Sequence, residues 1–169
     1  MNKIIFQLFG AFSVFINEEP LSELRLLKAK ALLAYLSSEP KQVYSRDVLM
    51  TLLWPESSAN KARNNLRIAL YRIRDALNTM EPGLSELLLT VTRHSLQFNI
   101  DADAEIDLLR FQQLLKEVSL HQHESVEQCP HCQEHLATVA ALYRGDFLSG
   151  MESLDCLLYT SDAADDDVR

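Results

Sequence analysis

The feature of this sequence that most constrains its fold is a long amphipathic segment between Ser58 and Leu77. Steps of about 100° per residue, starting from Leu66, bring its apolar side chains into one stripe. The stripe consists of Ala62, Leu66, Ala69, Leu70, Ile73 and Leu77. The opposite side carries Asn60, Lys61, Asn64, Arg67, Ile68, Tyr71 and Arg72. The pattern predicts a helix from Ser57 or Ser58 to about Leu77, with one side in a core and a basic, amide-rich side left uncovered.

Shorter elements are expected on both sides of this helix. Alternating hydrophobicity predicts strands at Ile4–Phe9 and Phe12–Ile16, joined by Gly10–Ala11. Helical spacing follows over Leu24–Ser37, where Leu24, Leu27, Ala31 and Tyr35 share a face that Lys30 and Ser37 avoid. A further helix is expected to begin at Ser45 and to stop before Pro55, with Val48, Leu49, Leu52 and Leu53 as its apolar face. The last element is a hairpin of Leu88–Val91 and Leu96–Ile100, with its tip at Thr92–Ser95.

Strands, three helices and a closing hairpin, in this order, predict an α+β winged helix-turn-helix over residues 1–100. Such a fold anchors one face of its longest helix and can insert the other face into a DNA major groove. Asn60 and Asn64 can donate and accept hydrogen bonds together, as adenine requires, and Ile68 can meet a thymine methyl group. The cations of the same helix can neutralise phosphates; they are Lys61, Arg63, Arg67, Arg72 and Arg74. Arg93 lies at the expected hairpin tip. A solvated basic face, or one covered by another domain, remains the alternative at this point.

Charge divides the chain unevenly. Residues 1–100 hold twelve Lys/Arg and nine Asp/Glu, whereas residues 101–169 hold four and fifteen, within a total of −8. The asymmetry suggests two modules with different partners. The acidic residues Asp101, Asp103, Glu105 and Asp107 mark the expected boundary and are interpreted as a solvated linker. Beyond them, Ile106–Val118 and Glu134–Tyr143 have helical spacing.

A segment rich in histidine and cysteine joins these two helices. It contains His121, His123, Cys129, Cys132 and His135. Two thiolates and two imidazoles can bind zinc tetrahedrally, so Cys129, Cys132 and His123 with either His121 or His135 form a possible site. The alternative is a pair of thiols at an interhelical turn with no metal. A thioredoxin-like oxidant is excluded because helices, not a βαβ unit, surround the Cys-x-x-Cys pair.

Several linked motifs resemble those of the Streptomyces antibiotic regulatory protein (SARP) type of transcriptional activator. The motifs are Leu8-Phe-Gly-Ala-Phe-Ser-Val14, Lys28-Ala-Lys-Ala-Leu-Leu-Ala-Tyr-Leu36, Ser45-Arg-Asp-Val-Leu49, Leu53-Trp-Pro55, Ala62-Arg-Asn-Asn-Leu-Arg67, Leu70-Tyr-Arg-Ile-Arg74, Asp107-Leu-Leu-Arg-Phe111 and Leu142-Tyr-Arg-Gly-Asp-Phe-Leu148. The resemblance covers about residues 4–155. It implies an OmpR-like winged helix over residues 1–100, followed over 101–155 by the first part of an all-α, TPR-like bacterial transcriptional activation domain that is truncated here.

The resemblance also implies roles. Ser58–Leu77 becomes the recognition helix and Thr90–Phe98 the wing, while the loop of Trp54, Pro55, Glu56 and Ser57 faces RNA polymerase. The expected function is a cytoplasmic, sequence-specific DNA-binding transcriptional activator that occupies direct repeats in promoters, with a homodimer possible on the DNA. A protein-interaction scaffold whose winged helix no longer binds DNA is the alternative.

Other function classes lack support in the sequence. It contains neither a Gly-rich phosphate loop nor a motif-backed nucleophile, so we expect no enzymatic activity, and no cofactor is required apart from the possible zinc ion. Its apolar stretches are too short to span a bilayer. Residues 156–169 continue no motif and are interpreted as a disordered tail or as an artefact resembling translated read-through, so the natural protein is expected to extend further.

Overall fold

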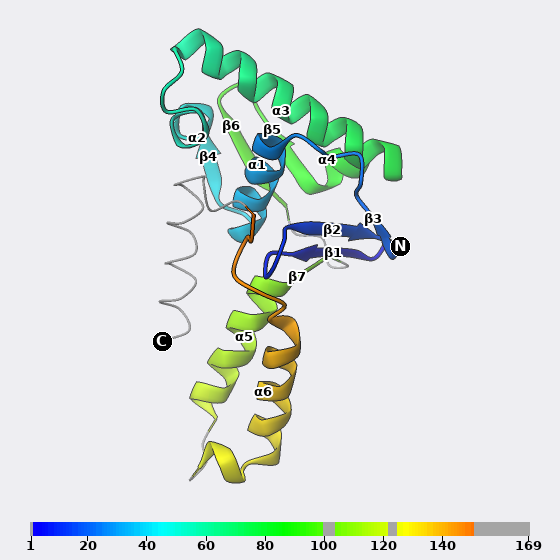
Figure 1. The fold of residues 1–169 in the computed structure, drawn as a ribbon, viewed down its shortest axis with the longest axis vertical. Helices are drawn as coiled ribbons and strands as arrows, with labels where there is room; N and C mark the ends of the chain where they lie inside the picture. Colours follow the sequence, from blue (N-terminus) through cyan, green and yellow to red (C-terminus); the bar gives the residue numbers. More distant parts are fainter. Residues whose placement is uncertain (1, 100–103, 122–124, 151–169) are drawn as a thin grey trace.

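The computed structural model describes residues 2–99, 104–121 and 125–150. In Figure 1 a cluster of helices and a protruding helical hairpin lie at opposite ends of the molecule, with an N-terminal sheet between them. The predictions made for Ile100, Asp101, Asp103, His123 and the 156–169 tail lie outside the described residues.

The N-terminal sheet has the strand order β3-β2-β1-β7. Its strands are β1 (Ile4–Gln7), β2 (Ser13–Ile16), β3 (Glu19–Pro20) and β7 (Ala104–Ile106). β1 is antiparallel to β2, as the alternating pattern predicts, and parallel to β7. The sheet is therefore completed by a strand from beyond the predicted boundary at residue 100.

Three helices pack against one another next to this sheet: α1 (Leu27–Ser38), α2 (Arg46–Leu53) and α3 (Ala59–Met80). Ser45 caps α2 by accepting a hydrogen bond from the backbone N–H of Val48 at 3.1 Å, as its position before an acidic first turn predicts. All six residues of the predicted apolar stripe of α3 are buried. This helix is thus confirmed, and it extends about one turn past Leu77.

Three predicted side-chain positions in α1 and α2 are wrong. Leu27 is 43% exposed because α1 begins there, and Val48 is 48% exposed at the start of α2. Ser37 is fully buried, not turned away from the core, and its Oγ donates a hydrogen bond to the carbonyl oxygen of Ala34 at 3.1 Å. A helical serine can enter an apolar core in this way because the preceding turn satisfies its hydroxyl.

The predicted hairpin is confirmed as the wing. Its sheet has the order β4-β6-β5, formed by β4 (Val43–Ser45), β5 (Leu89–Val91) and β6 (Ser95–Phe98), and the short helix α4 (Leu84–Leu88) leads into it. The sequence pattern did not show β3, β4, α4 or β7. An edge-to-face contact between Phe6 and Phe98, with centroids 5.1 Å apart, connects the wing to the N-terminal sheet.

The second half forms an α-hairpin of α5 (Asp107–Leu120) and α6 (Pro130–Leu142), with the short 3-10 turn Val126–Gln128 at its far end (Figure 1). Its near end is joined to the N-terminal sheet. The rings of Phe9 and Phe111 lie 4.8 Å apart, and those of Phe9 and Tyr143 5.5 Å apart. The backbone N–H of Leu148 also donates to the carbonyl of Leu8 at 2.7 Å. The two halves therefore share one core.

Asp107 contradicts the prediction of a solvated acidic linker. Its carboxylate is buried and accepts hydrogen bonds from the backbone N–H groups of Leu8 at 2.8 Å, Phe9 at 3.1 Å and Leu108 at 2.7 Å. Arg144 lies 3.5 Å away. Burial raises the pKa of Asp107 above its ordinary value, against the opposing effect of these donors and of Arg144. Asp107 thus fixes the loop after β1 to the start of α5.

Candidate nucleic-acid interface

The candidate interface is built on α3, the longest helix of the described residues. Ser58 begins the helix, and its side chain accepts a hydrogen bond from the backbone N–H of Lys61 at 3.3 Å. The buried stripe anchors α3 to the core, so the opposite side is held outward. In Figure 1 this helix lies along the edge of the molecule that is farthest from the α5–α6 hairpin.

The side of α3 predicted to be uncovered is exposed. Asn60, Lys61, Asn64, Arg67 and Arg72 all lie at the surface. Two large apolar side chains share it, Ile68 at 42% and Tyr71 at 63% exposure. Among the described residues, therefore, no other part of the chain covers this face of α3. A partner with both polar edges and methyl groups would suit this surface.

The cations of α3 lie along two edges of the exposed face. At 100° per residue, Arg63, Arg67 and Arg74 fall on the side that turns toward α2 and the wing, whereas Lys61 and Arg72 fall on the other side. Arg63 donates to the Oδ1 atom of Asn60 at 3.2 Å, which orders both side chains at the first turn. The amides between the two edges are thus flanked by positive charge.

A hollow of about 620 Å³ lies between the start of α2, the N-terminal half of α3 and the tip of the wing. Four arginines from three different elements line it: Arg46, Arg63, Arg67 and Arg93. Asp47 is its one acidic lining residue. A concave surface with this excess of guanidinium groups is suited to a phosphate backbone.

Arg46 is a member of this cluster that sequence reasoning missed. Its Nη2 and Nε atoms donate to the carbonyl oxygen of Thr92 at 2.8 and 3.1 Å, so it connects α2 to the wing. Partial burial lowers the pKa of Arg46, and the positive charges of Arg74 and Arg67 lower it further. Only the pairing of β4 with β6 brings Arg46 to the wing, and the sequence pattern did not reveal β4.

The predicted polymerase-facing loop lies between α2 and α3. Trp54 ends α2, donating its backbone N–H to the carbonyl of Met50 at 2.9 Å, and its side chain packs partly against the core. Pro55 and Glu56 are exposed, and Ser57 is half-buried. A fixed tryptophan followed by an exposed turn can present a small contact surface, and its partner stays a prediction.

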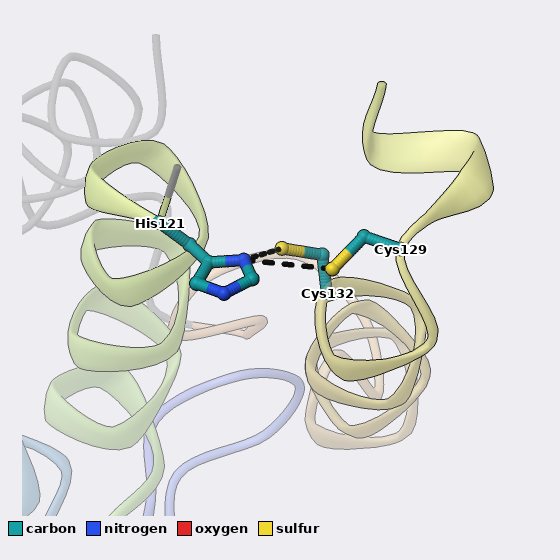
Figure 2. Close-up of side chains that lie close together, drawn as sticks. All are labelled: His121, Cys129 and Cys132. Atoms are coloured by element: carbon teal, nitrogen blue, oxygen red, sulfur yellow. Dashed lines mark hydrogen bonds between the residues drawn. The ribbon is translucent and has the colours of Figure 1, made fainter. Parts of the chain in front are cut away.

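The predicted metal ligands are only partly brought together. The Nδ1 atom of His121 lies 3.2 Å from the Sγ atom of Cys132 and 3.5 Å from that of Cys129 (Figure 2). His135 does not join this group, because its Nε2 atom lies 2.8 Å from Glu117 and its Nδ1 atom 2.9 Å from the carbonyl of His131. The histidine–cysteine cluster, defined here as His121, Cys129 and Cys132, is far from α3.

The comparison with protein families decides the class of the first domain. Residues 25–95 match the family described as "Transcriptional regulatory protein, C terminal". The match covers less than half of the chain. It runs from just before α1 to the first residue of β6, so it includes α3, the hollow and the tip of the wing. The OmpR-like winged helix expected from the SARP-type motifs is thereby confirmed.

The fold of the whole chain is similar to that of Mycobacterium tuberculosis EmbR, solved in complex with a low affinity phosphopeptide. The TM-score is 0.80 at 20% identity, over 99% of this chain and 43% of the EmbR chain. The chain thus spans less than half the length of that EmbR chain. At this identity the likeness concerns the fold, and it confirms a winged helix-turn-helix followed by a helical region.

No significant match exists among curated protein sequences. Across residues 2–99, 104–121 and 125–150, no helix has both the length and the apolar character that crossing a bilayer requires.

Proposed function

We propose that this protein is a sequence-specific DNA-binding transcriptional activator in which the exposed face of α3 occupies the major groove. The main support is the convergence of Arg46, Arg63, Arg67 and Arg93 on one hollow beside the uncovered amides of α3. Phosphate contacts position a protein on DNA, and base contacts select the sequence. The arginines around the hollow could supply the phosphate contacts, and the exposed amides of α3 could supply the base contacts. The domain that carries them matches a family of transcriptional regulatory proteins.

The residues divide by role. Arg46, Arg63, Arg67 and Arg93 bind phosphates around the hollow. On the outer edge of α3, Lys61 and Arg72 bind the backbone across the groove, and Arg74 adds positive charge farther along the helix. Asn60 and Asn64 read base edges, while Ile68 and Tyr71 contact methyl groups or sugars. The two cationic edges of the exposed face support this division.

The activator role and the arrangement on promoters rest on the SARP-type resemblance. In this proposal protomers bind direct repeats head to tail, pair as a homodimer on the DNA, and offer Trp54–Ser57 to RNA polymerase. Residues 101–155 act as the first part of the helical activation domain, and the site of action is the cytoplasm, where bacterial DNA lies. No reaction and no enzymatic cofactor are part of the proposal.

The experiment begins with selection of bound sites from random duplexes by the full chain. Affinity for the selected site is then measured against salt concentration for the wild type, Arg67→Ala and Arg110→Ala. Arg110 is a matched control, because it is an exposed arginine on α5, outside the interface. Removing one phosphate contact should lower the salt slope by about one in Arg67→Ala and leave it unchanged in Arg110→Ala. Equal slopes for all three proteins would remove Arg67 from the interface.

A further inference from the structure

The histidine–cysteine cluster lies at the far end of the α5–α6 hairpin, where the two helices are joined. His121 follows the last residue of α5, Cys129 immediately precedes α6, and Cys132 lies in the first turn of α6. Cys132 is fully buried, Cys129 is half-buried and His121 is exposed. Figure 2 shows the imidazole of His121 pointing across the gap between the helices at both sulfur atoms.

The two nitrogen–sulfur distances in the cluster are close to those of a tetrahedral zinc site. Zinc binds sulfur at about 2.3 Å and imidazole nitrogen at about 2.0–2.1 Å, which places ligand nitrogen and sulfur about 3.6 Å apart at a tetrahedral angle. The two nitrogen–sulfur distances here are 3.2 and 3.5 Å, and all three donor atoms lie within 4.8 Å of one another. Only small side-chain shifts are needed to admit the ion.

We propose that His121, Cys129 and Cys132 bind a zinc ion that fastens the end of α5 to the start of α6. Each thiol loses its proton to solvent when the metal binds. A water molecule completes the tetrahedron on the exposed side, next to His121. Because the three ligands span residues 121–132, the metal closes the interhelical connection as a cross-link would.

A bound zinc ion would also explain why polar groups and a buried thiol lie at this end of the hairpin. The apolar contact between the two helices is small there, since Leu120 is 70% exposed and Lys116 and Glu117 are also at the surface. A bound ion would supply the order that apolar burial does not supply at this end. The site is independent of DNA binding by α3.

The test is metal content and metal affinity of the full chain, purified in a reducing buffer and dialysed after incubation with zinc. The wild type should retain about one equivalent. Loss of a residue that only hydrogen-bonds to a metal ligand typically weakens metal affinity by roughly 10–100-fold. Cys129→Ser and His121→Ala each remove a direct ligand, so each should weaken zinc binding by at least that factor, measured by chelator competition. His135→Ala is the matched control, because its imidazole lies outside the cluster, and it should keep the metal.

Two further measurements guard against a variant that simply fails to fold. Cobalt in place of zinc should give the intense visible bands of tetrahedral coordination, together with thiolate charge-transfer absorption in the wild type. Hydrogen exchange should slow at residues 121–132 when zinc is added to the wild type and stay unchanged in His121→Ala. Any one of three results would overturn the proposal. These are a wild type that is free of metal after dialysis, an octahedral cobalt spectrum, and equal zinc affinity in the wild type, Cys129→Ser and His121→Ala.

Discussion

Replacing Asp107 should reveal how strongly the two halves of the chain are coupled. In Asp107→Ala the buried backbone N–H groups of Leu8 and Phe9 lose their acceptor, and so does that of Leu108 at the start of α5. An unsatisfied buried donor costs about 1–3 kcal/mol. The two donors of Leu8 and Phe9 alone therefore correspond to a loss of about 2–6 kcal/mol in the free energy of unfolding. Water that enters the vacated space can accept some of these hydrogen bonds, so we expect a value in the lower half of that range.

Asp107→Asn separates the hydrogen bonds from the charge. Oδ1 accepts from Leu8 and Leu108, and an asparagine oxygen can keep both bonds. The amide nitrogen in place of Oδ2 cannot accept from Phe9 and opposes the guanidinium of Arg144. We expect a loss of about 1–3 kcal/mol for this variant, smaller than for alanine.

Urea unfolding of the full chain, followed by far-ultraviolet circular dichroism, measures these losses. Arg144→Ala is the control, since its side chain is 43% exposed and its pairing with Asp107 at 3.5 Å should contribute no more than about 1 kcal/mol. The expected order of stability is wild type, Arg144→Ala, Asp107→Asn and Asp107→Ala. A loss below about 0.5 kcal/mol in Asp107→Ala would refute the argument that this carboxylate satisfies otherwise orphaned donors.

Other perturbations test separate parts of the structure. Asn64→Ala should cost about 1–3 kcal/mol on the selected DNA site and less on random duplexes, and equal losses in a competition assay would show that Asn64 only positions the backbone. Ser58→Ala removes the cap of α3 and should lower the free energy of unfolding by about 1 kcal/mol, measured in urea. Because burial raises the pKa of Asp107, the folded state binds the extra proton, so the stability due to this group should fall as pH rises from about 4 through its folded pKa. Asp107→Asn should lack that decline when unfolding is measured across pH. A chain ending at Ile100 lacks β7 and the Asp107 contacts, so its thermal transition should broaden or disappear relative to the full chain.

The main elements of the first domain were predictable because their signals are periodic and long. The stripe from Ala62 to Leu77 follows helical spacing through four turns, and burial agrees at every position. Ser45 marked the start of α2 through its capping chemistry, and the start of α3 was expected at Ser57 or Ser58, of which Ser58 is the cap. The exposed face of α3 followed directly, because a helix anchored on one side must present the other.

The remainder depends on contacts between distant residues. The local sequence of Ala104–Ile106 does not indicate a strand that pairs in parallel with β1. A run of acidic residues likewise does not indicate that one of them, Asp107, accepts hydrogen bonds from the backbone N–H groups of Leu8 and Phe9. Arg46 reaches the hollow through the pairing of β4 with β6, which only the tertiary fold specifies. The sequence shows that His121, Cys129, Cys132 and His135 lie in one segment. Which of these side chains come into contact depends on how α5 and α6 pack in the helical hairpin.

The central claim is that α3 and the wing, and not the α5–α6 hairpin, contact DNA. Backbone amide chemical shifts of the isotopically labelled full chain, recorded with and without the selected duplex, locate the contact surface residue by residue. The claim predicts the largest changes at residues 58–72 and at Thr92–Ser95, weakening together as salt is raised. Changes confined to α5 and α6, with α3 undisturbed, would contradict it.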